Sequence, residues 1–84
     1  MNKYLTYCAR AKLLNLFKGS RAIAIRLVSP PQGPLGVEFA FSSDGKHDIM
    51  ISISPPVITD RNTLRLLKDH SIDFDYQTSD FIIS

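Results

Sequence analysis

Apolar residues recur at helical spacing in only two stretches of this chain, and this restricts the folds that the chain can adopt. Between about Lys3 and Lys18, apolar residues recur every three or four positions, which predicts a helix that Gly19 ends. The apolar stripe of this helix consists of Leu5, Cys8, Ala9, Leu13, Leu16 and Phe17. A shorter helix is predicted to follow Asp60, whose side chain can cap its start. Two helices are too few for regular crossovers between parallel strands, so the strands should pair mainly antiparallel.

The remaining apolar residues form short, β-branched runs separated by prolines, glycines and turn residues. The predicted strands cover residues 21–28, 37–41, 48–53, 57–58, 72–76 and 81–83, and we expect the first to be buried on both faces. Asp44-Gly45 is the strongest hairpin signal in the chain and predicts that 37–41 pairs with 48–53. With 84 residues the chain has room for one hydrophobic core, so residues 1–84 should form a single α+β domain.

Charge is unevenly distributed along the chain, although the net charge is only +2. All charged residues in the first third of the chain are basic, and all acidic residues follow it. The basic residues of this part are Lys3, Arg10, Lys12, Lys18, Arg21 and Arg26. Such asymmetry can steer an acidic protein, an anionic membrane or a second copy of the chain, and does not by itself indicate nucleic acid. No apolar run approaches the roughly 20 residues of a membrane span. Cys8 is the only cysteine, so no internal disulfide can form, and we expect a cytoplasmic setting.

No combination of residues in the sequence points to catalysis or to a metal site. Cys8 lies on the predicted apolar stripe, where a single cysteine is typical of a small core residue. His47 falls in a predicted turn and His70 at a helix end, which favours solvated side chains. Asp73 and Asp75 alternate with apolar residues, as on the solvent face of a strand, and no calcium loop surrounds them. Since no nucleophile elbow is present either, we predict a non-catalytic protein without a bound metal or cofactor.

Six residues are candidates for contacts with a partner: Lys3, Arg10, Lys12, Lys18, Leu35 and Phe41. The four cations could meet an acidic protein surface or the headgroups of a membrane. Alternatively, they form the solvated face of an amphipathic core helix. Leu35 and Phe41 are expected to be exposed anchors near loops or sheet edges, with the charges setting orientation. An exposed final strand could also pair with a second copy, which would give a homodimer.

The order of these elements, and several short segments, resemble the HesB/IscA-like family, the fold of the A-type iron–sulfur carriers. The resemblance covers nearly the whole chain. The similar segments are Ile25-Arg26-Leu27, Asp48-Ile49-Met50-Ile51, Val57-Ile58-Thr59-Asp60, Leu64 to Leu67, Ser71-Ile72-Asp73-Phe74 and Asp80-Phe81-Ile82-Ile83. This resemblance implies a small mixed, largely antiparallel β-sandwich with an N-terminal helix and a second short helix.

The cysteine ligands of the family's carriers have no counterparts in this sequence. One such ligand lies in a loop that corresponds to about Gln32 and Gly33, and two more form a Cys-Gly-Cys pair on a C-terminal tail, whereas this sequence ends at Ser84. Clusters normally need several thiolates, and each chain offers only Cys8. The resemblance thus implies an accessory or adaptor protein that binds another protein in iron–sulfur cluster biogenesis without holding a cluster. The alternative is an iron or iron–sulfur carrier that uses partner ligands or Cys8 across a dimer.

Overall fold

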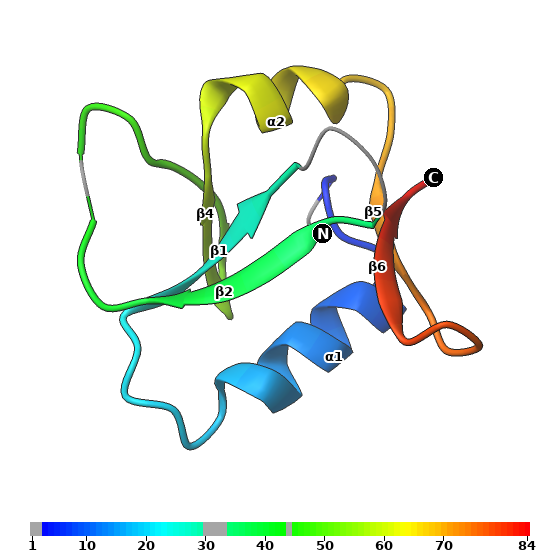
Figure 1. Ribbon diagram of the computed structural model, residues 1–84, viewed down its shortest axis with the longest axis horizontal. Helices are drawn as coiled ribbons and strands as arrows, with labels where there is room; N and C mark the ends of the chain where they lie inside the picture. Colours follow the sequence, from blue (N-terminus) through cyan, green and yellow to red (C-terminus); the bar gives the residue numbers. More distant parts are fainter. Residues whose placement is uncertain (1–2, 30–33, 44) are drawn as a thin grey trace.

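The helices and strands follow one another along the chain in the predicted order (Figure 1). The computed structural model describes residues 3–29, 34–43 and 45–84. Its elements are α1 (Tyr7–Phe17), β1 (Ala24–Val28), β2 (Gly36–Ala40), β3 (Ile49–Ile53), β4 (Pro56–Thr59), α2 (Arg61–Leu66), β5 (Ile72–Asp75) and β6 (Asp80–Ile83). The predicted α+β class is therefore confirmed.

The larger sheet has four strands in the order β2-β1-β4-β3. β1 pairs antiparallel with β2 and parallel with β4, and β3 pairs antiparallel with β4. Because β2 and β3 lie at opposite edges, the predicted hairpin between residues 37–41 and 48–53 is wrong. β3 instead turns back at once through Ser54-Pro55 into β4. A turn signal such as Gly45 describes only the local backbone, whereas a strand pairs with the neighbour that best buries its apolar residues. Asp44 itself lies outside the described residues.

The connection from β2 to β3 spans the width of the sheet and is fixed by Arg26 on β1. The Arg26 guanidinium donates to Asp48 Oδ2 at 2.9 Å and to the Ser42 carbonyl at 3.4 Å. The small buried cluster on this face consists of Ala24, Ala40 and Ile58. On the opposite face, Ile25 and Leu27 belong to the main core. The expectation that this strand is buried on both faces is therefore met only in its middle, because Ile23 and Val28 are exposed and Arg26 is half-buried.

Backbone pairing continues from the larger sheet into the smaller one. β5 and β6 pair antiparallel, β6 bridges to Leu35 just before β2, and β5 bridges to Leu5 just before α1. The paired backbone thus runs from Leu5 through β5, β6 and Leu35 into β2, and then through β1 and β4 to β3. In the described part of the chain this series has two ends, which are the segment at Leu5 and the outer edge of β3.

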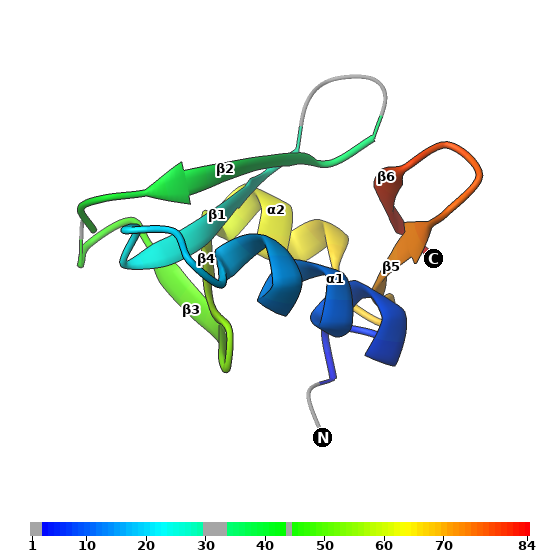
Figure 2. The same ribbon diagram turned by 90° about the horizontal axis from the view of Figure 1, so that it is seen from below.

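Helix α1 covers the inner face of the larger sheet, with its first turn beside β5 (Figure 2). Its buried residues are Ala9 and Leu13, which belong to the same core as the inner face of β1. The helix begins at Tyr7 rather than at the predicted Lys3. It starts later because Leu5 is paired as extended backbone with β5, and extended backbone cannot also take the helical conformation.

Cys8 is exposed, which contradicts its predicted place in the core. The buried face of α1 follows a spacing of four through Ala9, Leu13 and the partly buried Phe17. Cys8 is rotated by about 100° from Ala9 around the helix axis and so leaves that face. Leu16, another member of the predicted stripe, is 38% exposed for the same reason. The apolar residues of this segment fit two overlapping stripes, and only one of them faces the core.

The residues predicted to end the first helix and to start the second are confirmed. Gly19 adopts a positive φ of 83° after α1. Asp60 caps α2, because its Oδ1 accepts the N–H of Thr63 at 2.7 Å. Immediately before this cap, the fully buried Thr59 donates its hydroxyl to the Leu27 carbonyl at 2.9 Å, which fixes β4 against β1.

Replacement of Leu13 tests the position of the buried face of α1. Leu13→Ala should lower the free energy of unfolding by about 2–5 kcal/mol, because it empties a fully buried site in the main core. Leu16→Ala on the same helix is the matched control and should lower it by less than about 1 kcal/mol. Urea unfolding followed by circular dichroism measures both changes. Equal losses would contradict the placement of α1.

Candidate functional site

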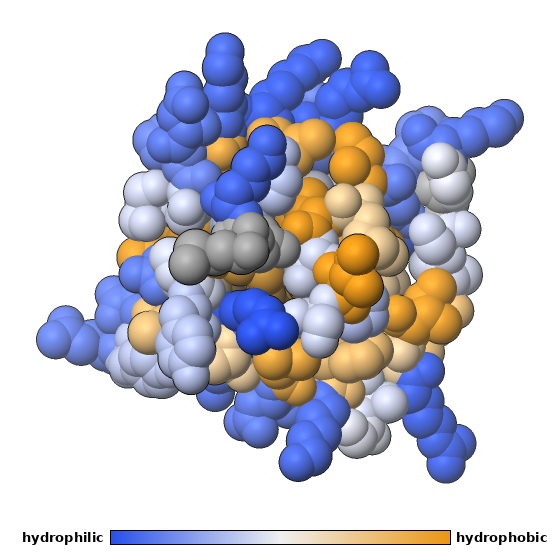
Figure 3. Space-filling model, turned by 180° about the vertical axis from the view of Figure 1, so that it is seen from behind, coloured by the Kyte–Doolittle hydropathy of each residue, from blue (hydrophilic) through white to orange (hydrophobic). Residues whose placement is uncertain are grey.

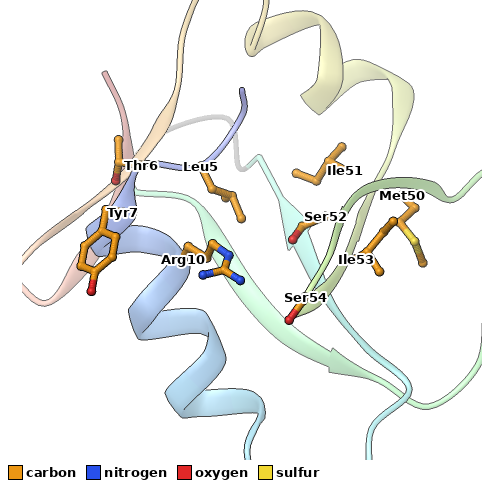
Figure 4. Close-up of a pocket in the computed structure, with 9 residues that line it drawn as sticks. All are labelled: Leu5, Thr6, Tyr7, Arg10, Met50, Ile51, Ser52, Ile53 and Ser54. Carbon is orange, nitrogen blue, oxygen red and sulfur yellow. The ribbon is translucent and has the colours of Figure 1, made fainter. Parts of the chain in front are cut away.

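A cleft of about 790 Å³ lies between β3 and the start of α1 (Figure 4). It is lined by Leu5, Thr6, Tyr7, Arg10, Met50, Ile51, Ser52, Ile53 and Ser54. Its two walls are the two ends of the paired backbone, namely the segment at Leu5 and the edge strand β3. A further strand placed in this cleft would therefore lie between those ends.

Apolar side chains form both the floor and the rim of the cleft. Leu5 and Ile51 are buried and extend into the space between the walls (Figure 4). Tyr7, Met50 and Ile53 stand at the rim and are 84%, 56% and 83% exposed. Seen from behind, the face that carries β3 shows apolar groups beside strongly hydrophilic ones (Figure 3). Apolar side chains exposed around a hollow favour a surface that a partner covers.

An irregularity in β3 explains why this strand presents apolar groups in two directions. Met50 pairs with Ile58 and Ser52 pairs with Val57, so Ile51 is an extra residue between two successive pairs. Such a β-bulge interrupts the strict alternation of side chains along a strand. Ile51 consequently turns into the core, while Met50 on one side of it remains exposed to solvent.

Arg10 is the charged residue of the cleft. Its side chain leaves α1, and its guanidinium points across the cleft towards the segment that carries Ser52 and Ser54 (Figure 4). The residue is half-buried. Within residues 3–29, 34–43 and 45–84, the Arg10 guanidinium has no hydrogen bond and no ion pair. The cleft therefore combines an apolar floor with a cation that can bind an anionic group.

Thr6 and Asp73 hold the α1 side of the cleft in place. The Thr6 hydroxyl accepts the N–H of Ala9 at 3.2 Å, which caps α1, and donates to Asp73 Oδ1 at 2.7 Å. The same carboxylate oxygen accepts the N–H of Phe74 at 2.9 Å. The Thr6 hydroxyl first, and the Phe74 N–H second, lower the pKa of Asp73 below its ordinary value.

Acid should weaken the protein partly through Asp73. A carboxylate whose pKa is lower in the folded than in the unfolded state contributes stability above the unfolded pKa, and this contribution is lost as the pH falls through the folded pKa. Wild type should therefore lose more stability than Asp73→Asn between about pH 5 and pH 2. Thermal unfolding across this range measures the effect, with Glu38→Gln as the exposed control. Parallel curves for wild type and Asp73→Asn would contradict the role given to this carboxylate.

The four cations proposed as interaction residues do not share one surface. Arg10 lines the cleft, Lys3 lies over the Tyr4 ring at 5.0 Å, and Lys12 lies over the Phe74 ring at 5.2 Å. Lys18 caps the far end of α1 and borders a separate hollow on that helix. Separate cations do not make the basic face that a peripheral membrane helix needs. Neither helix in the described residues has the length and apolar character needed to cross a membrane.

The two proposed anchors behave differently. Phe41 is 67% exposed, so its expected exposure is confirmed, and it lies near the exposed Ile23 and Phe39. Leu35 is buried, and its N–H donates to the Phe81 carbonyl at 3.0 Å. The expectation of an exposed Leu35 is therefore wrong, because pairing with β6 draws this segment inward.

Potential metal ligands are dispersed in the part of the chain that the structure describes. No group of three or more His, Cys, Asp or Glu side chains comes together there. Asp75 and Asp80 face each other across β5 and β6, and His70 Nδ1 lies 3.3 Å from the Ser84 carbonyl. The exposed Cys8 has no second thiol in its own chain.

Only Arg10 among the residues of the cleft is a candidate on sequence grounds. The others come together because β3 takes the edge of the sheet, which depends on long-range pairing. The sequence gives no clear local signal of the bulge, since Ile49, Ile51 and Ile53 alternate as in a regular strand. The bulge is seen only in the pairing of β3 with β4.

Comparisons with known proteins leave the family open. A search with protein-family models finds no match to this chain, and comparisons with curated proteins and with solved structures find none either. The resemblance to HesB/IscA-like proteins therefore rests on the order of the elements and on the short sequence segments. The function and the partner that it implies have the same basis.

Proposed function

We propose that this chain is a non-catalytic accessory or adaptor protein that binds another protein through the cleft between β3 and the start of α1. The observation that carries this proposal is the combination, in one hollow, of a strand edge, an exposed apolar rim and a cation that has no partner among the described residues. Binding surfaces commonly join apolar anchors with a few polar groups that set orientation.

The side chains of the cleft suit binding better than chemistry. Among the described residues, the lining includes hydroxyl groups, Arg10 and apolar side chains, but no His, Cys, Asp or Glu that could act as a general base or nucleophile partner. Tyr7 and Met50 at the rim are of the types that are enriched at protein interfaces. These features support a protein-binding role.

We also propose that the domain is a HesB/IscA-like β-sandwich. The order of elements supports this, and the similar segments at 48–51, 57–60 and 71–74 fall on or beside β3, β4 and β5. Iron–sulfur cluster biogenesis is then the natural context for the partner, although a fold alone does not fix a function.

The protein-binding role is tested by affinity capture with matched variants. Ile53→Glu places a charge on the 83% exposed rim, and Leu66→Glu places the same charge on the exposed side of α2, away from the cleft. We expect wild type and Leu66→Glu to capture the same protein, as quantified by mass spectrometry, and Ile53→Glu to lose most of it. A capture profile that is the same for all three proteins would reject the cleft as the binding surface.

The exposure of Cys8 favours one alternative, an iron or iron–sulfur carrier that shares thiols across a dimer or with a partner. An exposed thiol can reach a second chain, which a core cysteine cannot. Two copies would still supply fewer thiolates than a cluster normally has. The alternative therefore depends on ligands from elsewhere.

Anaerobic reconstitution with iron and sulfide separates the two functions. For an adaptor, wild type and Cys8→Ala should both remain colourless and free of stoichiometric iron, because neither holds a set of thiolate ligands. Iron analysis and visible absorbance give the readout. Iron that is retained by wild type and lost in Cys8→Ala would reject the adaptor function and support the carrier function.

A further inference from the structure

We propose that the cleft receives an extended segment of the partner that carries a carboxylate, and that Arg10 binds this carboxylate while the segment lies along β3. The inference rests on the proposed function, because it names the part of the partner that the same cleft would bind. It commits to a polypeptide in strand conformation.

The charge argument starts from the half-buried cations of the described residues, which are Arg10, Lys12 and Arg26. Lys12 lies over the Phe74 ring, and Arg26 pairs with Asp48. Arg10 has neither kind of partner within the described ranges. A cationic side chain that is partly withdrawn from water without a partner is less well stabilised than a paired one. A carboxylate that reaches Arg10 could accept two parallel hydrogen bonds from its planar guanidinium at once.

The shape argument comes from the strand edge. β3 has a described neighbour on one side only, and the opposite wall at Leu5 is itself extended and bridged to β5. An edge strand offers alternate N–H and C=O groups to an added strand. We place this pairing on residues 52–54, after the bulge, where the chain still lines the cleft. A helix could not use these groups, because its own backbone donors and acceptors are already paired.

The two arguments together predict a residue pattern in the partner. Arg10 comes from α1 and the floor residues Leu5 and Ile51 are buried beneath the cleft, so all three lie on the inner side of the sheet. Alternate residues of a strand face the same side. An acidic residue that meets Arg10 should therefore lie two positions from an apolar residue that meets the floor.

Selection from a displayed library of random peptides tests this pattern directly. The library is depleted on immobilised Ile53→Glu and then selected on wild type. We expect enriched peptides to contain Asp or Glu two positions from Val, Ile or Leu, with no proline between them. Peptides enriched without an acidic residue, or no enrichment over depletion, would overturn the inference.

Synthetic copies of enriched peptides then assign the contacts by fluorescence anisotropy. Arg10→Gln should weaken binding by about tenfold or more, and Arg10→Lys should recover only part of it, because lysine keeps the charge without the fork. Lys18→Gln, at the far end of α1, is the matched control and should leave binding unchanged. Thermal unfolding of each variant confirms that the fold is intact. Equal affinity for wild type and Arg10→Gln would reject Arg10 as the carboxylate receptor.

Changes in the peptide distinguish the source of the carboxylate and the role of the backbone. Loss on Glu→Gln assigns a side-chain carboxylate, and loss on amidation assigns the C-terminal one. Methylation of the peptide backbone nitrogens should weaken binding by about tenfold relative to the unmethylated peptide, since it blocks strand pairing. Unchanged binding after methylation would reject the extended strand. A captured partner that depends on Ile53 but not on Arg10 would overturn this inference alone and leave the proposed function standing.

Discussion

The hydrogen bonds of Thr6 decide where the chain stops being a strand and becomes a helix, and the cleft depends on that boundary. The Thr6 N–H donates to the Ile72 carbonyl at 3.0 Å, so the backbone up to this point belongs to the edge of β5. Its hydroxyl then accepts the Ala9 N–H and donates to Asp73, which starts α1 and ties it to the same strand. Leu5 is thereby turned inward, and Arg10 follows one helical turn after the cap.

The opposite wall depends on the central position of β1. β1 takes β2 on one side and β4 on the other, and β3 pairs with β4 at the edge farthest from β2. The buried Thr59 hydroxyl, which donates to the Leu27 carbonyl, holds β4 in this parallel position. Arg26 then fixes the long connection from β2 through Asp48. The edge that lines the cleft is therefore a consequence of pairing decided elsewhere in the sheet.

These dependencies explain which features the sequence could predict. The element order follows from local signals, such as the cap at Asp60 and the glycine after α1, and it was correct. The side of α1 that is buried depends on its start, and this is set by Asp73, which lies far away in sequence; hence Cys8 was misplaced. Strand neighbours depend on long-range pairing, so the hairpin at Gly45 and the exposure of Leu35 were also wrong. The cleft depends on both local signals and long-range pairing, and for that reason the sequence alone indicates only Arg10 among its residues.

Edge strands normally carry features that prevent uncontrolled pairing, and β3 carries two of them. The bulge at Ile51 disrupts the ladder, and Pro55 lacks an N–H and ends the strand. Together they leave only about three residues for an added strand, so backbone pairing by itself would be weak and poorly selective. Selectivity must then come from side chains, and the cleft supplies an apolar floor beside the half-buried residue Arg10. A short strand bound through one charge and one apolar contact would suit the adaptor role proposed above, because few contacts need to break when such a partner dissociates.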